Sequence, residues 1–173
     1  MGKKIIRLGL SESEIDNAIS ELNQYKRTIT EKMKKFRKRV AERLAQNIQD
    51  GFNGAIVDDL INDGPRFAHV NVTYDNKENI SVVIANGEDA VWVEFGAGVY
   101  YNGPSGTSPH PNGNNLGFTI GGYGQGKGSR KIWGFYEDGQ LRLTRGTPAT
   151  MPMYNTVRDI CKEITKIARE IFV

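Results

Sequence analysis

Apolar residues recur at helical spacing through the first third of the chain, and this pattern predicts a long amphipathic helix over residues 11–50. Ser11, with Glu14 three residues later, matches a capping box and marks the expected start of the helix. A break between Asn23 and Thr28 would instead give two helices. Unbroken, the helix would be about 60 Å long, so its single apolar stripe would need a partner along its flank. The stripe consists of Ile15, Ile19, Leu22, Ile29, Met33, Phe36, Val40, Leu44 and Ile48.

The two ends of the chain have different patterns. Residues 1–10 are expected to form either a short strand or an arm that docks on a neighbouring subunit by strand addition. Residues 151–172 predict a helix, because apolar residues there step by three and four. Its stripe would pack on the sheet by default, or against the helix of a neighbour. The stripe consists of Met153, Val157, Ile160, Ile164, Ile167 and Ile171.

Two hairpins are predicted between the helices. The first spans residues 66–85, where an alternating segment and a short apolar run flank a polar turn. The second spans residues 132–145 around Asp138-Gly139, a pair typical of tight hairpin turns. With the two helices, these hairpins predict an α+β fold in which the helices cross a small antiparallel sheet.

The segment between the hairpins begins with bulky residues and then changes abruptly. Residues 88–95 are expected to form a short helix or an extended turn that carries Trp92 and Phe95 into the core. Residues 96–131 form a glycine-rich loop, and the part from Gly96 to Gly128 holds eleven of the 20 glycines but one charged residue. Such a composition predicts a loop that cannot build a core of its own. The loop is either a flexible surface insertion or a segment that becomes ordered when a partner binds it.

Size and composition indicate one domain of 173 residues, long enough to bury a core. The net charge of +3 does not by itself indicate a nucleic-acid binder. The single cysteine, Cys161, excludes an internal disulfide, and its helical surroundings predict a buried packing role. No apolar run approaches the length of a membrane span.

Basic residues are concentrated in the predicted long helix, with nine Lys or Arg and two acidic residues between Lys26 and Arg43. This segment is either a solvated helix face or a face turned towards a DNA channel or an acidic partner. The candidate residues for such a contact are Lys34, Lys35, Lys38 and Arg39. Sequence-specific reading of DNA is not expected, because no aromatic residues are interleaved as base-stacking platforms.

Candidate chemistry in the loop is sparse. The segment from Gly121 to Lys127 resembles a phosphate-binding loop, but Gly128 stands where Ser or Thr is needed and a strand follows instead of a helix. His110 has no second histidine or cysteine nearby to complete a metal site, and no nucleophile–base pair stands out. The sequence therefore predicts no cofactor, no metal and no enzymatic activity.

Several short motifs occur in an order typical of one protein family. Val93-Glu94-Phe95-Gly96-Ala97-Gly98 resembles its "VEFGTG" signature, and a His-Pro pair, an aromatic strand and a Gly-Thr-Pro-Ala segment follow. In these motifs the chain resembles a phage morphogenesis family of tail components. These are small neck, tail-completion or head–tail joining proteins of long-tailed DNA phages, typified by the tenth gene product of a lambdoid HK-series phage. The matching residues are Val93, Glu94, Phe95, Gly96, Gly98, His110, Pro111, Trp133, Gly146, Pro148 and Pro152.

The resemblance implies a structural virion protein, assembled in the host cytoplasm as a subunit of a ring at the head–tail junction. Its expected partners are further copies in a six- or twelve-fold ring, the neighbouring connector and tail-tube proteins, and packaged DNA without sequence specificity, but no membrane. Aromatic residues of the loop would anchor it on a neighbouring subunit: Tyr100, Tyr101, Phe118 and Tyr123. The alternatives are a basic DNA-binding module and, with least support, an enzyme.

Overall fold

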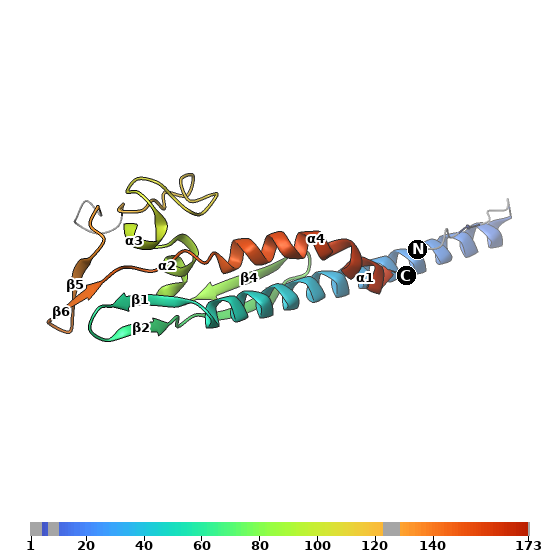
Figure 1. The fold of residues 1–173 in the computed structure, drawn as a ribbon. Helices are drawn as coiled ribbons and strands as arrows, with labels where there is room; N and C mark the ends of the chain where they lie inside the picture. Colours follow the sequence, from blue (N-terminus) through green and yellow to red (C-terminus); the bar gives the residue numbers. More distant parts are fainter. Residues whose placement is uncertain (1–4, 7–10, 123–128, 173) are drawn as a thin grey trace.

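The computed structural model describes residues 5, 6, 11–122 and 129–172. The chain is mixed α+β, as predicted, with a long N-terminal helix, small antiparallel sheets and a C-terminal helix (Figure 1). Its accessible surface is 11767 Å², whereas a compact monomer of 19.3 kDa would expose about 8500 Å². The excess reflects an elongated molecule whose long helix projects from the rest.

Helix α1 spans Glu12–Asn53 without a break, so the one-helix alternative holds. The capping box is confirmed: the Ser11 hydroxyl accepts from the Glu14 N–H, and the Glu14 carboxylate accepts from the Ser11 N–H. At about 1.5 Å per residue, α1 is about 63 Å long. Its C-terminal half carries the buried side chains Ala41, Ala45, Ile48 and Phe52, which recur at helical spacing on one face.

Helix α4, Pro152–Phe172, runs antiparallel to the C-terminal half of α1. The rings of Phe36 and Phe172 meet at one end, with centroids 6.1 Å apart, and Gly51 lies against Pro152 at the other. Between them Arg43 pairs with Glu163 at 2.8 Å. The expectation that α4 packs on a sheet is therefore wrong. Ile160 and Ile167 are buried, whereas Val157 and Ile164 of the same predicted stripe are exposed.

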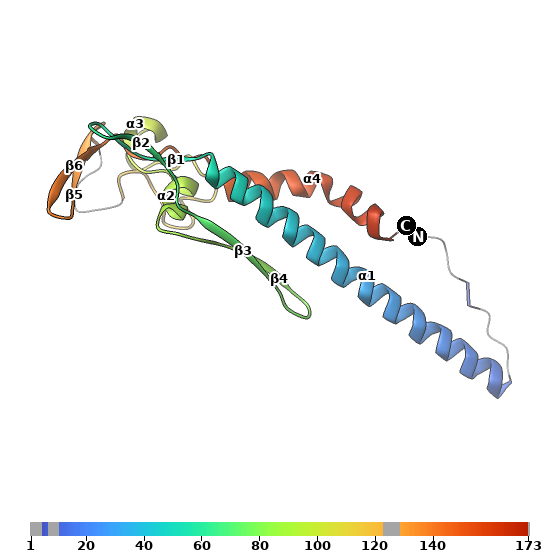
Figure 2. The ribbon, with the colours of Figure 1, turned by 90° about the horizontal axis from the view of Figure 1, so that it is seen from below.

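The strands form two sheets and three hairpins, one hairpin more than predicted. Strands β3 (Asn71–Asn76) and β4 (Ser81–Asn86) form a two-stranded sheet that flanks α1 on the side away from α4 (Figure 2). The predicted hairpin over residues 66–85 corresponds to this pair, but its first five residues lie outside β3. Residues 66 and 67 belong instead to β2, Gly64–Phe67, which pairs with β1, Ile56–Leu60.

The second sheet has the strand order β2-β1-β6-β5. Strands β5 (Trp133–Glu137) and β6 (Gln140–Thr144) form the predicted hairpin, and Asp138 and Gly139 both have positive φ, as a tight hairpin turn requires. Strand β1 pairs with β6 through Leu60 and Thr144. Strand β1 was not predicted, because its sequence Ile-Val-Asp-Asp-Leu does not alternate.

One apolar core joins these elements. It is formed by the C-terminal end of α1, the strands that follow it, and the short helix α2, Asp89–Phe95. The buried members are Ile48, Phe52, Ala55, Val57, Ala68 and Val93. Trp92 and Phe95, the predicted core residues of α2, are only half-buried. The buried apolar residue of α2 is Val93, one position after Trp92.

Candidate functional site

Glu94 of α2 lies against the first turn of α4. Its carboxylate oxygens accept hydrogen bonds from the backbone N–H groups of Met153 and Tyr154, each at 2.9 Å. The first N–H groups of a helix have no partner within the helix, and a negative charge there is favoured by the helix dipole. Glu94 is buried, yet its charge is satisfied. It therefore caps a helix that begins 58 residues later in the sequence.

His110 completes the surroundings of the Glu94 carboxylate. Its Nε2 lies 3.3 Å from Oε1 of Glu94, while its Nδ1 accepts from the Asn112 N–H at 3.1 Å. Because Nδ1 acts as an acceptor, the ring proton lies on Nε2, the nitrogen that faces the Glu94 carboxylate. The ring also packs against Phe95 and Tyr154, with centroids 4.6 and 5.2 Å apart. His110 thus holds the loop on α2 and α4, and each of its two ring nitrogens has a polar neighbour.

The described part of the glycine-rich loop has its own internal bonds. Gly106 donates to the Ile120 carbonyl and Ile120 donates to the Thr107 carbonyl, each at 2.7 Å. Ile120 is buried, and Phe118 stacks on Phe95 with ring centroids 4.1 Å apart. The expectation that the loop could not bury surface by itself is wrong for residues 98–122. These residues pack on the motif segment that precedes them.

A backbone bridge ties the start of the loop to the segment before α4. Ala97 and Thr147 exchange two hydrogen bonds of 2.9 Å. The amide of Asn102, in the short helix α3 (Val99–Asn102), donates to the Thr147 carbonyl at 2.8 Å and accepts from the Ala149 N–H at 2.8 Å. Local spacing does not predict these two contacts, because Thr147 and Ala149 lie about 45 residues from Asn102.

Glycine is required where these backbones cross. A Cβ atom on Gly146, whose φ is 95°, would overlap the carbonyl oxygen of Ala97. On Gly98, whose φ is 79°, it would lie 2.9 Å from the Arg145 carbonyl oxygen and 3.1 Å from the indole nitrogen of Trp133. Positive φ and close packing together leave no room for a side chain.

The residues of the family resemblance therefore meet in one region, which we call the junction. It comprises residues 93–98, His110, residues 146–149 and the start of α4. Val93 lies in the core, Pro152 begins α4 and is buried, and Pro148 is half-buried. Trp133 stands at the edge of the junction on β5, and Pro111 follows His110 on the surface. These motifs make structural contacts between α2, the loop and the start of α4, and they do not line a binding pocket among the described residues.

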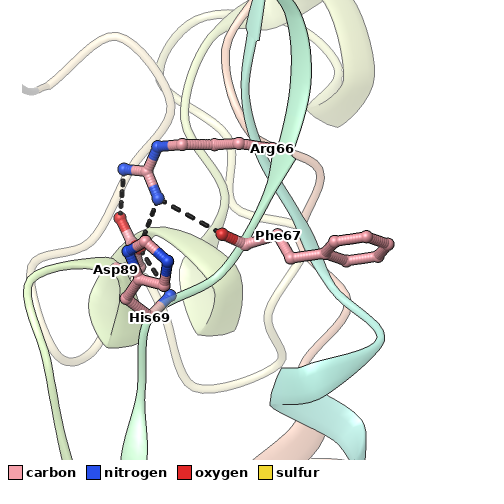
Figure 3. A network of polar contacts seen from close by, with 4 residues as sticks. All are labelled: Arg66, Phe67, His69 and Asp89. Carbon is pink, nitrogen blue, oxygen red and sulfur yellow. Dashed lines mark hydrogen bonds and ion pairs between the residues drawn. The ribbon is translucent and has the colours of Figure 1, made fainter.

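A second network, which no sequence pattern predicts, joins β2 to α2. The Arg66 guanidinium donates to both oxygens of Asp89, at 2.8 and 3.0 Å, and the His69 N–H donates to Oδ2 at 2.8 Å (Figure 3). Burial alone would raise the pKa of Asp89, but the Arg66 hydrogen bonds, the His69 N–H and the charge of Arg66 lower it below its ordinary value. No sequence spacing links these residues, because they lie on separate elements.

The predicted loop anchors have different environments. Tyr100 and Tyr101 are exposed and meet edge to face, and Arg145 lies over the Tyr100 ring at 5.5 Å. Phe118 is not a free anchor, because it stacks on Phe95. Tyr123 lies outside the described residues, as do Lys127 and Gly128 of the rejected phosphate-binding pattern.

The basic face of α1 is exposed. Lys34 and Lys38 pair within the helix with Glu31 and Glu42, at 3.5 and 3.8 Å. Such exposed pairs contribute little to stability and remain open to exchange with another partner. Two further residues of this face, Lys35 and Arg39, are also exposed.

The N-terminal half of α1 extends beyond the ends of both α4 and the β3–β4 hairpin (Figure 2). Its apolar stripe is open to solvent: Ile15 is 41% exposed, Ile19 51%, Leu22 53% and Met33 40%. A row of apolar side chains on a projecting helix is typical of an interaction surface.

Other candidate chemistry is limited. Among the side chains that the structure describes, no three His, Cys, Asp or Glu residues are grouped as a metal site. Within residues 5–6, 11–122 and 129–172 no helix is long and apolar enough to cross a membrane. Cys161 is exposed on α4, so the predicted buried role is wrong. No family model, curated protein or solved structure matches the chain.

Proposed function

We propose that the chain is a structural virion protein of a long-tailed DNA phage. It is a subunit of an oligomeric ring at the head–tail junction and acts in neck formation, tail completion or head–tail joining. Its role is geometric rather than catalytic: copies surround the DNA channel and contact the connector and tail-tube proteins. It would be assembled in the host cytoplasm and retained in the virion.

One observation carries this proposal: the short motifs of the family resemblance, scattered over 60 residues, meet at the junction. Glu94 and His110 are both buried and lie 3.3 Å apart; Glu94 accepts two hydrogen bonds from α4, and the His110 ring packs against Tyr154 of α4. Motif matches that arose by chance would have no reason to form one connected set of contacts. Their convergence supports a common architecture with the tail-component family, and the function follows from that likeness.

The shape of the molecule agrees with a role in an assembly. A surface about 40% larger than that of a compact monomer, together with an open apolar stripe on α1, suits one subunit among several. Exposed aromatic residues at Tyr100 and Tyr101 offer a further contact beside the junction.

Deleting the gene from the phage that carries it tests the proposal. Electron microscopy of the lysate should show filled heads and separate tails that fail to join, or tails with abnormal ends. The wild-type gene on a plasmid should restore joined particles, and so should a variant with the exposed Glu88 changed to Gln. A Glu94→Gln variant should restore fewer, because it weakens the junction. Joined, infectious particles without the protein would refute the proposal.

The basic face of α1 supports a second candidate, a DNA-binding module without sequence specificity. Four phosphate contacts from Lys34, Lys35, Lys38 and Arg39 would give a slope of about −3 to −4 for log affinity against log salt concentration. Fluorescence anisotropy with a duplex of arbitrary sequence measures this slope. Reversing these four charges to Glu should abolish binding, whereas no salt-dependent binding by the wild-type chain removes this candidate.

A further inference from the structure

The projecting half of α1 has the pattern of a coiled-coil strand. From Ile15 to Val40 the stripe follows a heptad repeat, with steps of four and three residues. The d positions are Ile15, Leu22, Ile29 and Phe36, and the a positions are Ile19, Lys26, Met33 and Val40. Helix α4 reaches this stripe only from Phe36 onwards, through the contact with Phe172. The heptads before Phe36 therefore lack a helical partner within the described chain.

The charges on this half of α1 are separated along its length. Residues 12–21 contain four acidic and no basic side chains, a net charge of −4. Residues 27–36 contain four basic side chains and one acidic side chain, a net charge of +3. A parallel pair of such helices would place like charges side by side, and an antiparallel pair would place opposite charges side by side.

We propose that the N-terminal half of α1 pairs with the same segment of a second copy, antiparallel and with the two-fold axis at residue 24. In this register each a residue meets a d residue of the partner, as antiparallel packing of heptads requires. Ile15 lies opposite Met33 of the second copy, Ile19 opposite Ile29, and Leu22 opposite Lys26. Residues 12–21 then lie along the basic residues 27–36 of the second copy.

The same register explains the position of Lys26. In a parallel pair the two Lys26 side chains would meet across the core and repel each other. In the antiparallel pair the aliphatic part of each Lys26 side chain packs beside Leu22 of the second copy, and its ammonium group reaches water. The overlap of 25 residues, from 12 to 36, ends where α4 begins to cover α1. The two folded bodies therefore stand at opposite ends of the pair and do not compete for space.

This inference is independent of the proposed place in a virion, because it concerns the free protein. Light scattering on the eluting full-length protein should give a mass twice that of the 19.3 kDa chain. Ile19→Glu should give a monomer with unchanged helix content, because Ile19 is half-exposed and not part of the core. The matched control Gln24→Glu adds the same charge on the opposite face and should leave the dimer intact. A wild-type monomer, or an Ile19→Glu variant that stays dimeric, overturns the proposal.

Cross-linking tests the direction of the pair. In a Cys161→Ser background, Asn23→Cys lies beside the axis and should cross-link to itself with a short bismaleimide. Asp16→Cys should not, because the two copies of residue 16 would be about 24 Å apart along the helices. A mixture of Asp16→Cys and Thr30→Cys chains should cross-link. Self-cross-linking of Asp16→Cys as efficient as that of Asn23→Cys would indicate a parallel pair and refute the proposed register.

Discussion

The junction and the projecting half of α1 are stabilised in opposite ways. At the junction, Glu94, His110, Asn102 and Gly146 make contacts to residues far away in the sequence, and Asn102 is half-buried while the other three are buried. In the first half of α1, hydrogen bonds run within the helix, between residues three or four apart, and the apolar stripe is exposed. The polar groups of Glu94 and Asn102 find partners within one chain, whereas the apolar stripe of the projecting helix is exposed.

This contrast predicts that substitutions at the junction change the stability of the monomer. Substitutions on the projecting helix should instead change association.

Gly146→Ala should have the largest effect, about 3–5 kcal/mol of lost unfolding free energy, because it combines a strained positive φ with overlap against the Ala97 carbonyl. Gly139→Ala is the matched control, since Gly139 also has positive φ but open space around it. It should cost about 1–2 kcal/mol. Urea denaturation measures both, and equal losses would show that packing at the Ala97–Thr147 bridge is unimportant.

Glu94→Gln should lower the free energy of unfolding by about 2–3 kcal/mol. The amide has one oxygen, so it can accept only one of the two N–H hydrogen bonds, and the negative charge at the start of α4 is lost. The loss should appear as a lower midpoint of urea denaturation and as faster hydrogen exchange in the first turn of α4. Glu88→Gln, an exposed change in the same region, should alter stability by less than about 0.5 kcal/mol. Equal stability of both variants would contradict the capping role of Glu94.

Arg66→Met should lower the free energy of unfolding by about 2–3 kcal/mol at neutral pH, because it leaves the buried Asp89 carboxylate with one hydrogen bond, from the His69 N–H. The folded-state pKa of Asp89 is lowered from its ordinary 3.8, so its ionised form stabilises the wild type above that pH. That contribution is lost as pH falls through the lowered pKa, and the difference between wild type and variant should narrow. A difference that stays constant from pH 7 to pH 3 would contradict the ion pair.

Ser11→Ala should have the smallest effect on global unfolding, because the first turns of α1 are not packed against the core. The local effect should still be visible in Glu14. The Ser11 side chain and backbone N–H lower the pKa of Glu14, so the variant should raise that pKa towards 4.5. NMR titration of the Glu14 carboxylate measures the change, and an unaltered titration would contradict the capping box.

Local patterns predicted the helices well and the junction only in part. The stripe from Ile15 to Ile48 and the Ser11–Glu14 pair are local signals, and they indicated α1 with its cap. Asp138-Gly139 likewise indicated the β5–β6 turn. Asn102 and the Arg66–Asp89 pair gave no signal, because nothing in local spacing encodes a contact over 20 or more residues.

The glycine-rich loop shows a further limit of composition. Its few bulky residues suggested that it could not bury surface, but Phe118 and Ile120 find partners within the chain itself. The motif residues indicated an important segment without indicating what they do. Only the fold reveals that Glu94 caps α4 and that His110 supports Glu94.

Hydrogen exchange at several protein concentrations distinguishes a self-contained junction from an associating half of α1. Backbone amides of residues 12–35 should exchange quickly in dilute protein and become protected as concentration rises, because in the proposed pair a second copy covers their exposed apolar stripe. Amides of the junction and of residues 40–53 should be protected equally at every concentration. Protection of residues 12–35 that does not depend on concentration would contradict the division between a self-contained junction and an associating helix.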